Sequence, residues 1–190
     1  MKKRYILAAS AVLAGVLAVG VWSGGLMHYG MAQHMHNGGQ GHDMARMPML
    51  NGRDTTAEEV EELRALFTNH LALTRTVENL PNGIKTLTET DDPELLEALF
   101  NHAAGMIARV DESRDPQIPI QSPTLDYLFA HPDRITTDIE PTDNGLIVIQ
   151  TSDDPKMVEA LQTHAAEVSD LAARGMQSVH EAMSQRHHNN

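Results

Sequence analysis

The residues with the most evident chemistry are the methionines and histidines that crowd one short segment near the N-terminus. Between Leu26 and Leu50 the chain carries six methionines and four histidines among Gly, Gln, Asn and Pro, with no helical or strand periodicity. Thioether sulfur prefers Cu(I), and imidazole accepts both Cu(I) and Cu(II). The chain has no cysteine, so we predict a flexible segment that binds copper through these residues. They are Met27, His28, Met31, His34, Met35, His36, His42, Met44, Met47 and Met49.

This segment contains two short clusters of Met and His, Gly41-His42-Asp43-Met44 and Met47-Pro48-Met49, of a kind that recurs in the proteins named next. The segment resembles the Met/His-rich stretches of bacterial periplasmic copper-resistance proteins. The resemblance is one of composition, so it implies a compartment and a metal but no fold. Two alternatives stay open: a spacer whose methionines are incidental, and zinc or nickel bound by the histidines alone, which would leave the methionines unexplained.

The first 25 residues are predicted to direct export. Met1–Arg4 is positively charged, and Tyr5–Trp22 is an apolar run rich in Ala, Val and Leu. Because the run approaches the ~20 residues that span a bilayer, a cleaved signal peptide and an N-terminal membrane anchor are both open. Either one places the rest of the chain in the periplasm, soluble or tethered to the inner membrane. The net charge of −12 argues against nucleic acid as a partner and limits membrane contact to this segment.

From residue 55 the chain repeats itself. Glu78–Val110 aligns without gaps with Glu140–Ala172, and Asn-Gly, Asp-Asp-Pro, Glu-Ala-Leu and His-Ala-Ala recur in register. Each unit is interpreted as a β-hairpin with a type I′ Asn-Gly turn, followed by a helix with an Asp cap and a Pro in its first turn. A further helix is expected at Ala57–Leu73. We therefore predict an α+β fold in which two pseudo-symmetric β-hairpin–helix repeats form a four-stranded antiparallel sheet packed with helices.

Each repeat helix carries a histidine on its apolar stripe. A two-fold relation between the units would bring His102 and His164 towards each other, as a site for a metal or a haem, with Met106 as a further ligand. Because Val168 stands where the first unit has Met106, such a site would be asymmetric. The alternative is that both histidines are core residues with bonded ring nitrogens. The stripes are Leu95, Leu99, His102, Met106 and Val110, and Met157, Leu161, His164, Val168 and Leu171.

The second repeat helix is expected to continue past Gly175, with a stripe of soft-metal ligands on one face. The stripe consists of Met176, His180, Met183 and His187. The alternative is that the two methionines pack on the core, with His180 at its boundary. The expected organisation is a leader at 1–25, a flexible segment at 26–54, an α+β domain at 55–184 with repeats at about 66–110 and 128–172, and a tail at 185–190.

No motif of a known catalytic site occurs in the chain, so we do not expect an enzyme. The leading hypothesis is a periplasmic copper-binding protein for sequestration, resistance or delivery to a periplasmic cuproprotein or copper exporter. The second hypothesis is a haem-binding or electron-transfer protein with His102 or His164 and Met106 as axial ligands. The third is a periplasmic interaction module that binds no metal.

Overall fold

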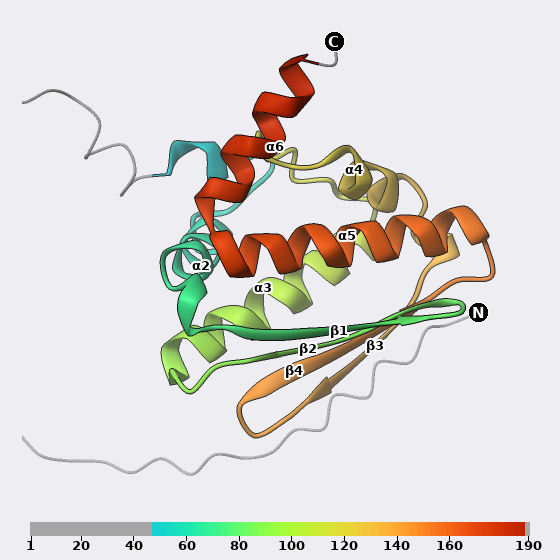
Figure 1. Cartoon of the computed structure of the whole chain (residues 1–190), viewed down its shortest axis with the longest axis horizontal. Helices are drawn as coiled ribbons and strands as arrows, with labels where there is room; N and C mark the ends of the chain where they lie inside the picture. The colour runs from blue at the N-terminus through green and yellow to red at the C-terminus, as the bar shows by residue number, and fades with distance from the viewer. Residues whose placement is uncertain (1–46, 189–190) are drawn as a thin grey trace, which may run out of the picture.

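The computed structural model describes residues 47–188, which form an α+β fold (Figure 1). In this part of the chain, five α-helices accompany a four-stranded antiparallel sheet with the strand order β1-β2-β4-β3, and the helices lie on one side of it. The predicted fold class is therefore confirmed. Within residues 47–188 no helix is long and apolar enough to cross a membrane. The predicted leader and most of the Met/His segment lie outside the described residues.

The two hairpins of the sheet are joined through their inner strands. The strands are β1 (Thr74–Leu80), β2 (Gly83–Glu89), β3 (Thr136–Pro141) and β4 (Gly145–Thr151). β1 pairs with β2, β3 pairs with β4, and β2 pairs with β4 so that Thr86 lies opposite Val148. Because side chains alternate between the two faces of a sheet, this register defines the face that the helices cover. Its central residues are Ile84, Thr86, Thr88, Leu146, Val148 and Gln150.

The Asn-Gly pairs do not form type I′ turns, and this part of the prediction is wrong. None of their four residues has the positive φ that a type I′ turn requires. In the first hairpin Leu80 pairs with Gly83, so the loop consists of Pro81 and Asn82. Proline holds its φ near about −65°, which excludes the left-handed conformation at the first loop position.

The glycines of these pairs are instead required where the two hairpins meet. A β-carbon at Gly83 would overlap the carbonyl oxygen of Gln150, and a β-carbon at Gly145 would overlap that of Thr88. Both sites lie at an end of the β2–β4 pairing. The missing side chains therefore allow the inner strands to approach each other closely.

Two long helices cross the covered face of the sheet. They are α3 (Pro93–Asp111) and α5 (Pro155–Arg174). As predicted, each follows an aspartate, Asp92 or Asp154, whose carboxylate accepts hydrogen bonds from backbone N–H groups of the first turn. α3 contacts β4, whereas α5 contacts β1 and β2. Each helix thus lies over strands of the other hairpin.

The same order of elements occurs twice along the chain. A helix, a 3-10 turn, two strands and a long helix form α2 (Ala57–Thr68), η2 (His70–Ala72), β1, β2 and α3. The second series is α4 (Pro123–Ala130), η3 (Pro132–Arg134), β3, β4 and α5. This order is what an internal repeat produces, but the pseudo-two-fold relation between the units stays a prediction. The helix expected at Ala57–Leu73 ends at Thr68 and is followed by the separate turn η2.

The C-terminal helix is not a continuation of α5, and this expectation is also wrong. α5 ends at Arg174, and α6 (Met176–His188) leaves in a different direction (Figure 1). Gly175 between them has φ +56°, and a β-carbon there would lie 2.7 Å from the ring of His70. The His70 Nδ1 is 2.9 Å from the carbonyl oxygen of Ala172 in the last turn of α5. The close approach of His70 and the left-handed glycine together end the helix.

Residues 47–54, which the sequence assigned to the flexible segment, belong to the folded domain. η1 (Pro48–Leu50) packs against α2, and Leu50 is completely buried. Leu50 forms an apolar cluster with Val60, Phe67 and Val179. Burial of this leucine is worth roughly 1.5–3 kcal/mol, so it ties the start of the described chain to α2 and α6.

The close contact between the hairpins leads to opposite expectations for two glycines. Gly83→Ala should lower the free energy of unfolding by ~1–3 kcal/mol, because the methyl group meets the carbonyl of Gln150. Gly105→Ala, in α3, should raise it by about 0.5–1 kcal/mol, since nothing lies within 4 Å of its β-carbon position. Urea denaturation followed by circular dichroism measures both. A Gly83→Ala variant as stable as the wild type would contradict the tight junction.

Candidate functional site

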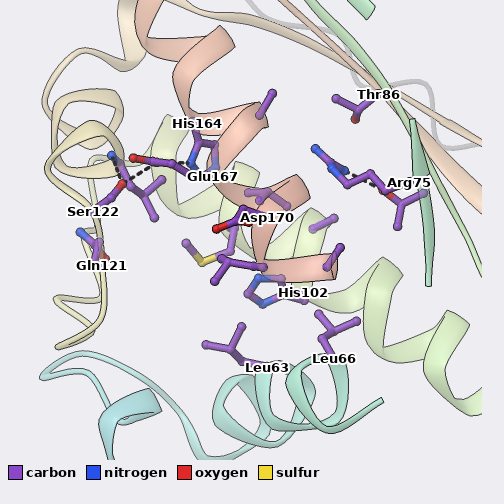
Figure 2. A pocket seen from close by; sticks show the side chains of 18 of the residues that line it. Leu63, Leu66, Arg75, Thr86, His102, Gln121, Ser122, His164, Glu167 and Asp170 are labelled. Atoms are coloured by element: carbon purple, nitrogen blue, oxygen red, sulfur yellow. Dashed lines mark hydrogen bonds and ion pairs between the residues drawn. The ribbon is translucent and has the colours of Figure 1, made fainter. Parts of the chain in front are cut away.

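A cavity of about 420 Å³ lies between the covered face of the sheet and the helices (Figure 2). β2 and β4 form one side of it, and α2, α3, α5 and α6 contribute to the others. Both apolar core clusters line it, Ile84 and Leu128 from one cluster and Phe67 and Val179 from the other. Most lining residues are aliphatic. Ligand pockets typically have volumes of about 300–1,000 Å³, apolar walls and a few convergent polar groups.

His102 and Met106 line the cavity from α3, one helical turn apart. Burial lowers the pKa of His102 to about 4; the nearby carboxylate of Glu59 opposes the shift and the charge of His164 adds to it. Within the described residues no hydrogen bond is made by the ring nitrogens of His102. The imidazole is therefore neutral at physiological pH, with a lone pair that a ligand in the cavity can use.

His164 lines the same cavity from α5, beside a carboxylate. Its Nδ1 is buried 3.6 Å from Oε2 of Glu167, close enough for electrostatic interaction but without a hydrogen bond. The hydroxyl groups of Ser122 and Thr124 donate to this carboxylate at 2.8 and 3.2 Å. Burial raises the pKa of Glu167, but these contacts and His164 outweigh it and lower the pKa. A carboxylate at one ring nitrogen orients a metal-binding histidine and leaves the other nitrogen to the metal.

Arg75 brings a positive charge to the sheet side of the cavity (Figure 2). It occupies an inward position of β1, opposite Thr88. Its Nη1 donates to the hydroxyl of Thr88 at 2.7 Å, and its Nε donates to that of Ser169 at 3.3 Å. Burial lowers the pKa of Arg75 to about 10, so the group stays protonated at neutral pH. Among the described residues no carboxylate forms an ion pair with it.

A second arginine, Arg109, lies on α3 two helical turns after His102 and lines a small cavity with it. Its side chain is 3% exposed and is saturated by five hydrogen bonds to Glu59, Asp54 and the carbonyl oxygen of Arg114. This cluster and His102 surround a small cavity of about 20 Å³, room for about one water molecule. Arg109 therefore fixes α3 against the N-terminus of α2.

The structure places the other predicted metal ligands away from the cavity. Met47, Met176 and Met183 pack against the apolar cluster of Leu50, Val60, Phe67 and Val179. Met49 is half-buried, and His180 is exposed. The methionines near both ends of the described chain thus meet as packing residues at one cluster, while their role in metal binding stays a prediction. The remaining predicted ligands of the segment lie outside the described residues: Met27, His28, Met31, His34, Met35, His36, His42 and Met44. The side chain of His187 also lies outside what the structure describes.

Several polar residues of the cavity were not found from the sequence. Arg75 could have been found, because strand alternation places it on the same face as Val77. Glu167 carries a weaker signal, since it lies one helical turn after His164. Nothing in the sequence indicated that the connection between α3 and α4 reaches the cavity with Gln121 and Ser122.

In comparisons with protein-family models, curated proteins and solved structures, nothing matches this chain. The interpretation of the cavity therefore rests on its own residues: the imidazoles of His102 and His164 and the thioether of Met106 on the long helices, the imidazole of His70 on η2, and the guanidinium of Arg75 on the sheet.

Burial of His102 leads to a pH-dependent stability of the metal-free protein. The unfolded chain takes up a proton on this imidazole near pH ~6.5, whereas the folded protein does so only near pH 4. Between these values the unfolded state binds more protons, so stability falls as the pH falls from about 6.5 to about 4. His102→Gln should reduce this slope, and His180→Gln, at an exposed position, should leave it unchanged. Urea denaturation at a series of pH values with a chelator present measures the slopes. Equal slopes in all three proteins would contradict the buried, neutral state of His102.

Proposed function

We propose that this protein binds copper outside the cytoplasm and that its defined site lies in the central cavity, at His102, Met106 and His164. The observation that carries the proposal is that α3 and α5 present two imidazoles and a thioether to one cavity. His102 is held neutral there by burial. A metal ion binds the deprotonated imidazole nitrogen, so this environment keeps the ligand in its binding form across the physiological pH range.

The set of donor atoms favours Cu(I) over harder metals. Within the described part of the chain, no three His, Asp or Glu side chains gather into a metal site. Zinc sites commonly use four ligands of the nitrogen, oxygen or thiolate kind, whereas thioether and imidazole suit Cu(I). The lining is mainly aliphatic, and apolar surroundings influence the redox properties of a bound metal. Glu167 would orient His164 from behind.

In this proposal the Met/His segment and the folded domain have different tasks. The segment, exported to the periplasm by the leader, captures copper with its many thioethers and imidazoles. The cavity then holds the ion, for sequestration or for delivery to a periplasmic cuproprotein or a copper exporter. The composition of the segment supports the compartment and the metal.

Competition of the full chain with a chromophoric Cu(I) chelator tests the cavity site. His102→Gln and His164→Gln should each weaken one tight site by more than about tenfold, and Glu167→Gln should weaken it by about 10–100-fold through loss of the orienting carboxylate. His180→Gln is the control, since this histidine is exposed on α6. If His180→Gln weakens binding and the cavity variants do not, copper is bound by the C-terminal stripe. If the wild type binds no copper, the proposal fails.

Haem binding is a second candidate, and the size of the cavity favours it. A volume of about 420 Å³ exceeds the need of a single ion, and the apolar walls suit a macrocycle. His102 or His164 and Met106 would serve as axial ligands. Addition of haemin to the metal-free protein should then give a sharpened, shifted Soret band that changes in His102→Gln and in Met106→Leu. A spectrum identical to that of free haemin would exclude this candidate.

A further inference from the structure

The cavity contains a positive charge that no group of the described chain neutralises. Arg75 is largely buried, and burial is the cause of its lowered pKa. Its two hydrogen-bond partners, Thr88 and Ser169, are neutral hydroxyl groups. Buried charges in proteins are normally paired, because an isolated one loses several kcal/mol of hydration free energy. An unpaired guanidinium in a cavity is therefore a candidate for ligand binding.

The carboxylates that line the same cavity are already engaged elsewhere. Asp170 binds Arg174 and Ser178, which hold its pKa at about 2. Glu167 accepts hydrogen bonds from Ser122 and Thr124. Neither of them forms an ion pair with Arg75. An ion pair with Arg75 would therefore need a partner from outside the described residues.

Arg186, the other arginine of the cavity lining, also has only neutral partners among the described residues, but these are backbone carbonyl groups. The Nη1 of Arg186 donates to the carbonyl oxygen of Gln121 at 2.9 Å, and its Nε donates to that of Ala182 at 3.4 Å. Both oxygens are backbone acceptors with partial negative charge. At Arg75, as at Arg186, the Nη2 atom makes no hydrogen bond within the described chain; Arg75 differs in lying on the sheet, where its two partners are side-chain hydroxyl groups.

We propose that the cavity binds an apolar molecule that carries one carboxylate, with the carboxylate held by Arg75 and the apolar part enclosed between α3, α5 and the sheet. The planar guanidinium matches the two oxygens of a carboxylate, and one positive charge is balanced by one negative charge. Most of the remaining lining is aliphatic and offers the contacts that an apolar body needs, among them Leu99, Ile107, Leu146 and Val148. The volume of about 420 Å³ lies in the range of small-molecule sites, about 300–1,000 Å³.

This site is distinct from the proposed copper ligands. Arg75 and Thr86 lie on the sheet side of the cavity, whereas His102 and His164 come from the helices (Figure 2). Carboxylate binding depends on Arg75, and copper binding depends on the imidazoles. Either function can therefore fail without the other.

Fluorescence titration of the metal-free full chain tests the proposal. Cis-parinaric acid, a flexible fatty acid, and 1-pyrenebutyric acid, a rigid ring system with one carboxylate, are the two acidic probes, and their methyl esters are the uncharged controls. The wild type should bind at least one acid about tenfold or more tightly than its ester, as expected for charge-assisted hydrogen bonds. The preferred acid tells whether the apolar body is a chain or a ring system. Equal affinity for acid and ester, or no binding of any probe, would overturn the proposal.

Three variants separate the role of the charge from that of the cavity. Arg75→Met keeps a long side chain and removes the charge, so affinity for the acid should fall to that for the ester. Arg53→Met, at an exposed arginine, should bind like the wild type. Ala103→Leu reduces the cavity volume and should weaken acid and ester alike.

Thermal unfolding shows whether Arg75→Met loses acid binding because the charge is gone or because the protein no longer folds. Without ligand, Arg75→Met should melt at or above the wild-type temperature, because an unpaired buried charge is removed. The wild type should gain stability on addition of the preferred acid, and Arg75→Met should gain none. An Arg75→Met protein that still prefers the acid to the ester would overturn the assignment of the carboxylate to Arg75. One that unfolds in the absence of ligand would show that Arg75 has a structural role instead.

Discussion

The pairing of β2 with β4 is the constraint on which the rest of the structure depends. It joins two hairpins that are distant in sequence, and the helix that follows each inner strand is carried along with it. Because the strands are antiparallel, α3 and α5 start at opposite ends of the sheet and pass over each other's hairpin. His102 and His164 come to one cavity for this reason. The contact is close enough to require glycine at Gly83 and Gly145.

The centre of the sheet is more polar than a simple core would need. Thr86 and Thr88 are buried on the face that the helices cover, and Gln150 and Arg75 line the cavity beside them. β-Branched threonine suits a strand, but valine would satisfy the same backbone preference without a hydroxyl group to solvate. An apolar cavity of about 150 Å³ already stays dry and binds benzene-sized molecules. A larger one with hydroxyl, imidazole and guanidinium groups on its walls has the character of a binding site.

The helices and strands could be predicted from local signals in the sequence. The wrong predictions concern the hairpin turns and the end of α5, where residues distant in sequence come into contact. The caps Asp92 and Asp154 are local features, and both hold in the structure. Asn-Gly indicated a type I′ turn because glycine in such a pair usually allows the positive φ of the turn. Here the glycine is required instead by the close approach of a strand of the other hairpin. The end of α5 depends on His70, which approaches Gly175 from η2. Neither contact has a signal in the local sequence.

Some residues of the candidate site could likewise be predicted from the local sequence, and others could not. His102, Met106 and His164 could be named in advance because they lie on apolar stripes where a polar or soft ligand stands out.

The different roles of Arg75 and Arg109 could not be predicted, because the sequence does not show which residues neutralise the charge of an arginine. Arg109 uses all its donors within the fold and pins α3 to α2, so its burial is explained by structure alone. Arg75 is buried with two neutral partners and with donors left over, at the edge of a cavity. The difference in how the two guanidinium groups are satisfied separates a residue that stabilises the fold from one that the fold holds ready for a ligand.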